Sequence, residues 1–244
     1  MNKRILRWIH VQFLLTILLF LVYILASLLG GYLGFWYFNS AIAYALVFAN
    51  IFLFLVISTL FRARIEVLIN RSFLLRIVDK QGPPLPIKRI HELASLEQYL
   101  RMQEFTVFAK QGTHTVFSRM KKDDIKKIFR GYILEVVVYI RPNMDEFYLD
   151  HVDECVQKLQ DEAIKNKQKV EKILVTQIKK VTELDDDTKN KIKEIIFLRT
   201  QSGIISTINV GLHEASGKAI LLYSDEYSPS MYYRYHIDQI KRMV

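Results

Sequence analysis

Cysteine is nearly absent from this chain of 244 residues, in which Cys155 is the only one. A single cysteine cannot close an internal disulfide, so the sequence excludes a fold stapled by disulfides and agrees with a reducing compartment. We expect Cys155 to pack as a small apolar residue beside a helix core. Internal repeats and low-complexity tracts are absent as well, which leaves no sign of a repeat protein.

Charge is absent from residues 11–61, where no Asp, Glu, Lys, Arg or His occurs. A buried helix of a soluble protein would show polar positions every three or four residues over such a distance. The hydrocarbon core of a bilayer, about 30 Å thick, requires roughly 20 residues of helix. The 51 residues of this run therefore suffice for two spans and a turn. We predict two transmembrane helices in the lipid bilayer, over residues 11–29 and 42–60.

The predicted connection between the spans, residues 28–40, combines glycine with aromatic residues. We expect the glycines to reverse the chain and the aromatic rings to lie at the head-group level of the membrane. The residues expected to allow the reversal are Gly30, Gly31 and Gly34 together with Asn39 and Ser40, and the aromatic residues are Tyr32, Trp36 and Tyr37. A cleaved secretory signal is the competing interpretation of the N-terminus, but the apolar segment exceeds the roughly 7 to 15 residues usual there and a second span follows directly.

The formal net charge of +9 is concentrated beside the predicted spans. Residues 1–10 carry +3, residues 62–86 carry another +3, and residues 87–244 carry only the remaining +3. The loop between the spans carries none. Because basic residues favour the cytoplasmic side of a membrane, we predict that both termini are cytoplasmic. The large domain has little excess charge, so nucleic acid is not indicated as a partner.

Residues 62–86 are expected to connect the membrane hairpin to a separate domain. Apolar residues recur at helical spacing over residues 62–79, with arginines on the other side, although two strand-like stretches keep a β-strand alternative open. The arginines expected to contact anionic lipid head groups are Arg62, Arg64, Arg71 and Arg76. The following stretch, QGPPLP at residues 81–86, is predicted to be a stiff, extended linker.

The second predicted span carries a stripe of small residues. Ala41, Ala45 and Ala49 recur every four residues, which places them on one helical face where the first span can approach closely. Asn50 is the one strongly polar residue deep in this span, and we expect it to form a hydrogen bond across the helix pair or across a dimer. A channel or transporter would need an oligomer, since two helices cannot enclose a pathway. A protein partner or a homo-oligomer is expected on another ground, because tethering to a membrane raises the effective concentration of a domain toward partners there.

Residues 87–244 are predicted to form a layered α/β or α+β domain with a mixed sheet. Residues 136–140 are apolar on both faces, which is typical of a central strand covered on each side. Residues 213–217, HEASG, are predicted to form a hairpin turn. The predicted helices cover residues 91–102, 121–130, 144–168, 185–198 and 230–243, and the predicted strands cover residues 105–110, 115–120, 132–140, 171–178, 204–212 and 218–224.

One cluster resembles a metal site by its spacing. Asp150, His151 and Glu154 lie within one helical turn, and His151 and Cys155 are four residues apart, the spacing at which two helical side chains can share a metal ion. No further ligand follows nearby, and the helical pattern places His151 on the solvent side. We therefore expect a solvated helix face and no metal.

Motifs for catalysis are missing. A nuclease of the restriction type needs an acidic residue at one strand end and Glu-x-Lys on the next, whereas Lys172 follows Glu171 directly and Glu135 stands alone in its strand. Neither a phosphate-binding glycine loop nor a nucleophile elbow is present. The sequence therefore predicts no catalytic residues and no cofactor, and leaves open whether the chain is an enzyme.

A ligand pocket is the remaining candidate site. His213 and Glu214 lie beside the predicted hairpin turn, and Tyr233 and His236 lie in the last helix among other tyrosines. These side chains could line a pocket, although a packed aromatic face is the simpler interpretation. We expect a non-enzymatic binding or regulatory module tethered to the inner face of a membrane. The alternative is a ligand-sensing effector or enzyme whose domain controls an oligomeric transmembrane assembly.

Overall fold

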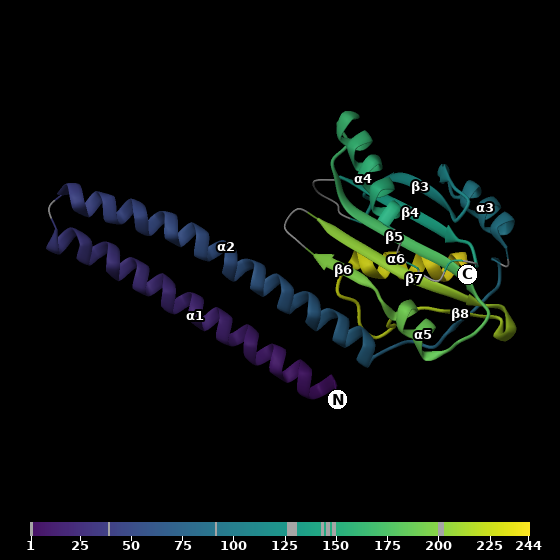
Figure 1. Cartoon of the computed structure of the whole chain (residues 1–244), viewed down its shortest axis with the longest axis horizontal. Helices are drawn as coiled ribbons and strands as arrows, with labels where there is room; N and C mark the ends of the chain where they lie inside the picture. Colours follow the sequence, from purple (N-terminus) through teal and green to yellow (C-terminus); the bar gives the residue numbers. More distant parts are fainter. Residues whose placement is uncertain are drawn as a thin grey trace. The chain divides into compact units, whose positions relative to one another are not determined.

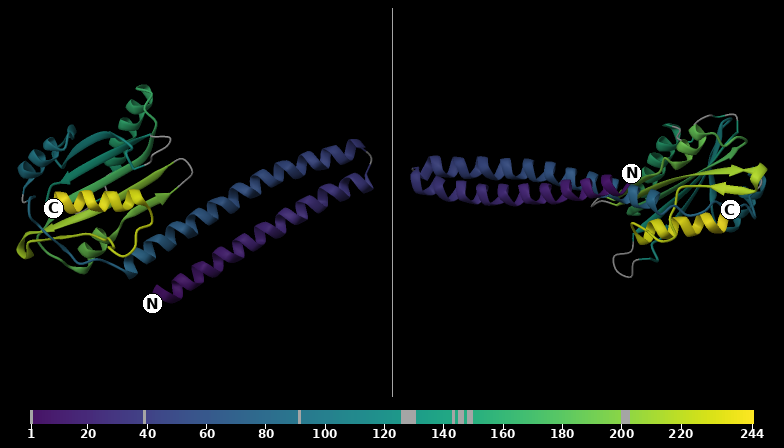
Figure 2. Two further views of the ribbon diagram at one scale, coloured as in Figure 1. Left: turned by 180° about the vertical axis from the view of Figure 1, so that it is seen from behind. Right: turned by 90° about the horizontal axis from the view of Figure 1, so that it is seen from below.

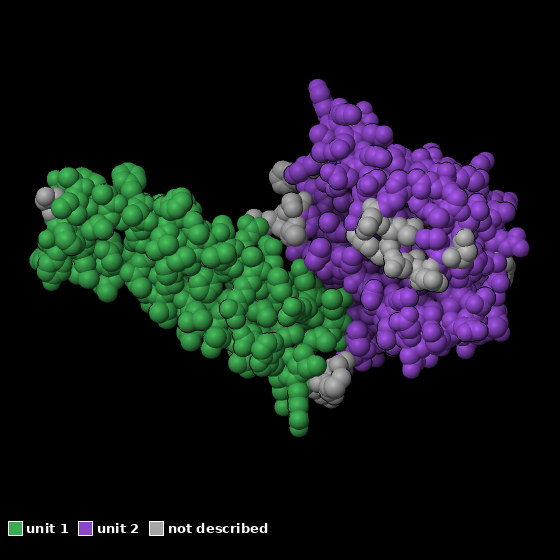
Figure 3. Space-filling view, in the orientation of Figure 1, with its two compact units in different colours: residues 1–75 green, residues 76–244 purple. Residues whose placement is uncertain are grey.

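The computed structural model describes residues 2–38, 40–90, 92–125, 131–142, 144, 147, 150–199 and 203–244. The chain divides into two compact units, residues 1–75 and residues 76–244 (Figure 3). The first unit is helical, and the second contains the sheet of the protein.

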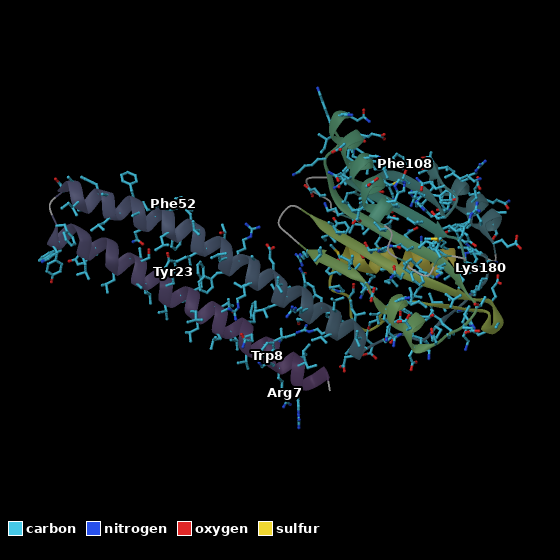
Figure 4. The ribbon with its side chains drawn as sticks, viewed as in Figure 1. Arg7, Trp8, Tyr23, Phe52, Phe108 and Lys180 are labelled. Atoms are coloured by element: carbon cyan, nitrogen blue, oxygen red, sulfur yellow. The ribbon has the colours of Figure 1, made fainter. Side chains whose placement is uncertain are left out.

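Two long helices, α1 (Asn2–Tyr37) and α2 (Ser40–Asp79), make up the first unit and the start of the second (Figure 1). Both are long enough and apolar enough to cross a membrane. Their outward faces carry large apolar side chains such as Phe52, whereas Tyr23 lies between the helices and its ring is 6.0 Å from that of Phe54 (Figure 4). An apolar outer surface of this length is stable in lipid and costly in water.

The turn between α1 and α2 is shorter than the sequence predicts. α1 continues to Tyr37, so Gly30, Gly31 and Gly34 lie within the helix, and the prediction that they reverse the chain is wrong. A helix satisfies its own backbone hydrogen bonds, which outweighs the preference of glycine for turns in an apolar stretch. The rings of Tyr32 and Trp36, one helical turn apart, stack at 6.2 Å between centroids.

α2 continues without a break to Asp79, so the helical interpretation of residues 62–79 is confirmed and the strand alternative is wrong. An ion pair of 3.1 Å between Arg62 and Glu66, four residues apart, lies on this segment. The last residues of α2 belong to the second compact unit, which begins at Arg76.

The second unit is built on a mixed sheet, as predicted (Figure 1). Its strand order is β1-β8-β7-β5-β4-β3-β2, and β6 pairs with β7. β4, β5 and β7 are mutually parallel, and the remaining pairs are antiparallel. The strands are β1 (Leu85–Pro86), β2 (Thr106–Lys110), β3 (His114–Lys122), β4 (Tyr132–Ile140), β5 (Val170–Val181), β6 (Ile196–Arg199), β7 (Ile204–His213) and β8 (Lys218–Ile220).

Helices cover both faces of the sheet, which makes a three-layer domain. α4 (Asp150–Lys165) and α5 (Asp186–Lys193) lie on one face, while α3 (Leu93–Met102) and α6 (Met231–Met243) lie on the other. Successive side chains of β4 point to opposite faces of the sheet, so both faces need a cover. Val136 and Val138 pack under α4, whereas Glu135 and Val137 face α3 and α6. Figure 2 shows α6 on the side of the sheet opposite to α4.

Several predicted elements are confirmed. Residues 136–140 are buried and lie in β4, an interior strand between β3 and β5. The turn at residues 213–217 is a short 3₁₀ helix, Glu214–Ser216, closed by Gly217 in the left-handed region at φ 61°. Glycine adopts that conformation without a steric penalty.

Other predicted elements are wrong in extent or type. The predicted helix 185–198 ends at Lys193, because Ile196–Arg199 instead pair with β7 as β6, where β-branched and aromatic side chains suit a strand. Residues 121–122 extend β3, and the remainder of the predicted helix 121–130 lies largely outside the described residues. Within the predicted helix 144–168, α4 covers Asp150–Lys165, so the helix ends before the predicted end, and residues 144 and 147 are not part of it.

The proline-rich segment is part of the second unit and does not stand apart from it. The Gly82 amide donates to the carbonyl of Tyr223 at 2.8 Å, and the Tyr223 hydroxyl donates to the carbonyl of Pro83 at 2.8 Å. Leu85–Pro86 then pair with β8 as β1. The prediction of a linker that separates anchor from domain is therefore wrong for these residues, since their backbone is fastened to β8 and to the residues after it.

Close approach of β5 and the start of β7 gives a test of the sheet. A Cβ atom on Gly203 would lie 2.2 Å from the carbonyl oxygen of Glu171, so Gly203→Ala must push the two strands apart. We expect a loss of about 1–3 kcal/mol in unfolding free energy. Gly112→Ala is the matched control, because a Cβ there meets nothing within 4 Å. Thermal unfolding in detergent, followed by circular dichroism, measures both, and equal melting temperatures would contradict the strand packing.

Candidate functional site

Polar side chains gather between α6 and the sheet, and we call this set the α6 polar layer. α6 begins at Ser230, whose hydroxyl accepts a hydrogen bond of 3.0 Å from the Tyr233 amide and so caps the helix. The tyrosine and histidine side chains of the helix then meet polar residues of β3, β4, β5 and β7. The α6 polar layer consists of Asp123, Glu135, Arg119, Lys172, Thr176 and Ser206 with Tyr232, Tyr235 and His236.

His236 is at the centre of this layer. Its Nε2 lies 2.9 Å from the Thr176 hydroxyl oxygen, and its Nδ1 lies 3.0 Å from that of Ser206. Burial lowers the pKa of His236 to about 3, so the ring is neutral near pH 7. A serine beside a histidine is chemically a nucleophile with a base. Ser206 is fully buried, however, so its hydroxyl has no access to a substrate in this conformation.

Glu135 forms the second group of the layer. Arg119 donates from Nε to Oε2 of Glu135 at 2.7 Å, and the Tyr235 hydroxyl donates to Oε1 at 2.6 Å. Arg119 also donates to the carbonyl of Gln103 at 2.5 Å and lies 4.5 Å above the ring of Phe105. Burial and the Glu135 carboxylate raise the pKa of Tyr235. Both oxygens of Glu135 are therefore engaged by protein donors.

Asp123 and Lys172 form the third group, near the start of β5. The Tyr232 hydroxyl donates to Oδ2 of Asp123 at 2.6 Å, and Nζ of Lys172 lies 3.2 Å from the same oxygen. Lys172 also pairs with Glu171 at 2.6 Å. Burial alone would lower the pKa of Lys172, but hydrogen bonds to Glu171 and Asp123 outweigh it and raise the value. Bonds from Lys172 and Lys169 lower the pKa of Glu171 to about 2.

Asp123, Glu171 and Lys172 together resemble the acidic residues and lysine of a restriction-type nuclease, although the sequence lacks the Glu-x-Lys motif. Asp123 follows β3, whereas Glu171 and Lys172 belong to β5, so only the sheet brings them together. Asp123 and Lys172 are buried, at 0% and 2% exposure, and they neutralise each other. Among the described residues, no group of three or more His, Cys, Asp or Glu could hold a metal ion.

A small cavity lies between α3, α6 and the sheet. It encloses about 30 Å³, room for one or two water molecules and far below the roughly 300 Å³ of a typical ligand site. Its walls include Tyr99, Leu100, Gln103, Phe105, Glu135, Thr176, His236, Gln239 and Met243. Among the polar residues of this wall, Glu135 is bonded to Arg119, and His236 is bonded to Thr176.

The four candidate pocket residues lie in three different places. His236 lines the cavity, whereas Tyr233 packs edge-on against Phe197 with ring centroids 5.6 Å apart. His213 and Glu214 lie at the exposed turn between β7 and β8, where Glu214 pairs with Lys180 at 2.5 Å. The structure thus does not bring His213, Glu214 and Tyr233 to the cavity that His236 lines.

The histidine and cysteine of α4 do not converge on a common point. His151 Nε2 lies 2.7 Å from the side-chain nitrogen of Gln111, and its ring centroid lies 5.2 Å from that of His114. Cys155 is buried in the core under α4, which confirms its expected packing, and burial raises the pKa of its thiol. The side chain of Asp150 lies outside the described part of the structure.

Asn50 joins α1 to α2 within the first unit. Its Oδ1 accepts a hydrogen bond of 2.9 Å from the Ser27 hydroxyl, and its Nδ2 donates to the Ser27 carbonyl at 2.8 Å. This is the bond across the helix pair that the sequence predicts. Ala43 of α2 is buried at 1% exposure. Ala41, Ala45 and Ala49 are instead exposed, because the Asn50–Ser27 pair turns a different face of α2 toward α1.

The four arginines expected near lipid lie along α2. Arg62 pairs with Glu66, and Nη2 of Arg64 donates to Oε1 of Gln12 at 3.0 Å. Arg71 is exposed, and Arg76 lies 5.6 Å above the ring of Tyr227.

The buried histidine predicts a pH dependence of stability. The pKa of His236 is about 3 in the folded chain, against 6.5 for a histidine exposed to water, so the unfolded chain binds one more proton between these values. Its stabilising effect is complete above pH 6.5 and declines as the pH falls, by up to about 1.4 kcal/mol per pH unit. We expect His236→Gln to flatten this decline in urea titrations of the full chain. His213→Gln, at the exposed turn, should leave the slope unchanged, and an unchanged slope in His236→Gln would contradict the assignment.

Comparisons with known proteins assign this chain to no family. No family model matches it. No curated protein and no solved structure matches it either. Its candidate function therefore rests on its own residues.

Proposed function

We propose that the chain is a membrane-anchored binding or regulatory module, non-enzymatic, whose domain acts at the inner face of a membrane. The observation that carries this proposal is the internal pairing of the α6 polar layer. Its acids, its lysine, its arginine and its histidine bond to one another or to neighbouring hydroxyls. The cavity beside them encloses about 30 Å³, too little for an organic substrate. In the described part of the domain, these groups serve packing and leave the outer surface to make contacts with partners.

The anchoring half of the proposal is supported by α1 and α2. Both helices satisfy the length and hydropathy of a membrane span, and basic residues flank the apolar run while the turn carries no charge. This asymmetry favours cytoplasmic termini. Confinement to a membrane surface raises the effective concentration of the domain toward partners on that surface.

A ligand-sensing effector is the second candidate, and the attachment of residues 76–90 to the domain favours it. Nζ of Lys80 pairs with Glu226 at 2.8 Å, and Arg76 lies above Tyr227. The amide of Lys88 donates to the carbonyl of Val244 at 2.6 Å. The end of α2 and the residues after it are thus fastened to the C-terminal end of α6 and to the segment before α6, so a shift of α6 would pull on them.

The orientation of the chain gives the first test. In a Cys155→Ala background, we expect Phe38→Cys to react with a membrane-impermeant maleimide added to intact cells, because Phe38 lies at the turn between the helices. A tag after Val244 should resist protease added outside the same cells. Digestion of the tag without lysis, or failure of Phe38→Cys to react until the cells are broken, would overturn the cytoplasmic placement.

Replacement of the hairpin distinguishes the two candidate functions. Residues 1–75 are exchanged for an unrelated two-span hairpin of the same orientation, and the chimera is introduced into a strain that lacks the protein. A tethered module should restore the deletion phenotype, because only anchoring is needed. An effector should fail, because its output passes through α1 and α2. As the control, the amount of chimera that resists alkaline carbonate extraction is compared with that of the wild-type protein. If the two amounts are equal and the chimera still does not restore the phenotype, the tethered-module proposal is contradicted.

A further inference from the structure

A groove opens between α1 and α2 at the level of Asn50. It encloses about 440 Å³, and its walls include Ile24, Ser27, Leu28, Gly31, Asn50 and Ile51. Most of this lining is apolar, and its polar groups are those of Ser27, Asn50 and Tyr32, which also lines the groove. The groove lies entirely within the first compact unit.

We propose that this groove is the contact surface for a second copy of the chain, with the carboxamides of the two Asn50 residues paired across a two-fold axis. The proposal rests on the membrane anchoring proposed above. It adds that the partner is a second copy of the chain and that the contact is made through the groove between α1 and α2.

The hydrogen-bonding capacity of Asn50 exceeds what α1 supplies. A carboxamide offers two N–H donors and an oxygen with two lone pairs. Ser27 takes one of each, through its carbonyl at 2.8 Å and its hydroxyl at 2.9 Å. One donor and one acceptor site of Asn50 are left by these two bonds. Acyl chains can satisfy neither, so in lipid a polar partner across the groove is favoured.

Access to Asn50 depends on Gly31. A Cβ atom at this position would lie 3.8 Å from Nδ2 of Asn50, so any longer side chain would spread over the amide. Glycine leaves that approach open within the groove. Gly31 lies within α1, which continues to Tyr37, so it does not form a turn. Access to Asn50 is a reason for a glycine at this position.

A second copy satisfies this site better than an unrelated helix does. All copies of one chain share the same orientation, so each presents Asn50 at the same depth in the bilayer. A carboxamide is also self-complementary, because each partner donates one N–H and accepts one. The pairing therefore needs no residue that the chain does not already carry.

The opposite face of α2 makes the competing contact. Ala41, Ala45 and Ala49 are exposed there, and small residues at this spacing allow close helix approach. That face offers no polar group at the depth of Asn50. The two faces are distinguished by cysteines two residues apart, since Ile51 lines the groove and Ala49 does not.

Disulfide crosslinking of the full chain in its membrane tests the proposal. Ile51→Cys and Ala49→Cys are each made in a Cys155→Ala background and oxidised with copper phenanthroline. We expect Ile51→Cys to give mainly disulfide-linked dimer and Ala49→Cys to give several-fold less. Equal or greater crosslinking at Ala49 would assign the contact to the alanine face and overturn the proposal, as would the absence of dimer at both positions.

Substitutions at the polar pair test the role of Asn50. In the Ile51→Cys chain, Asn50→Leu should lower the dimer yield several-fold, whereas Ser27→Ala should leave it unchanged, because the carboxamide remains. An equal loss in both variants would show that Asn50 acts only within one hairpin. Alkaline carbonate extraction is measured in parallel. Release of the chain would overturn anchoring and the groove contact together, whereas a resistant chain that does not crosslink overturns the groove contact alone.

Discussion

Helix α6 is held on the sheet by buried polar bonds, and the arrangement of the domain depends on them. Asp123 with Lys172, and Glu135 with Arg119, are charges that would be costly to bury alone. Each meets a tyrosine of α6, and His236 between them meets Thr176 and Ser206. A displacement of α6 along the sheet would break all three groups together, so the polar layer specifies one position for the helix where apolar contacts would tolerate several.

The same bonds limit the chemistry of the domain. Carboxylates, a lysine and a serine–histidine pair are the usual components of active sites, and all of them occur beneath α6. Here each is satisfied by another protein group and shielded from solvent, and the adjoining cavity holds no more than one or two waters. The polar layer therefore serves the packing of α6 on the sheet, and this internal pairing is what supports the proposed binding role.

In the first unit, Asn50 has a role comparable to that of the polar layer. Among apolar side chains, its two bonds to Ser27 fix how α2 is rotated against α1. That rotation buries Ala43, leaves the alanine stripe exposed and opens the groove beside Gly31. One polar residue therefore decides which faces of the hairpin meet each other and which remain exposed.

The sequence by itself determined the elements whose signal is local. The uncharged run predicts two apolar helices, the doubly apolar residues 136–140 predict an interior strand, and the turn at Gly217 follows from its glycine. Ile196–Arg199 pair with the next strand, β7, from Arg199 with Ile204 to Ile196 with Thr207, and this pairing decides between a strand and the end of the predicted helix. Only the tertiary structure decided the meeting of Asp123 with Lys172 and Tyr232, and the separation of His236 from His213. These contacts join residues far apart in sequence, and no local pattern encodes which strands are neighbours or how far one helix is rotated against another.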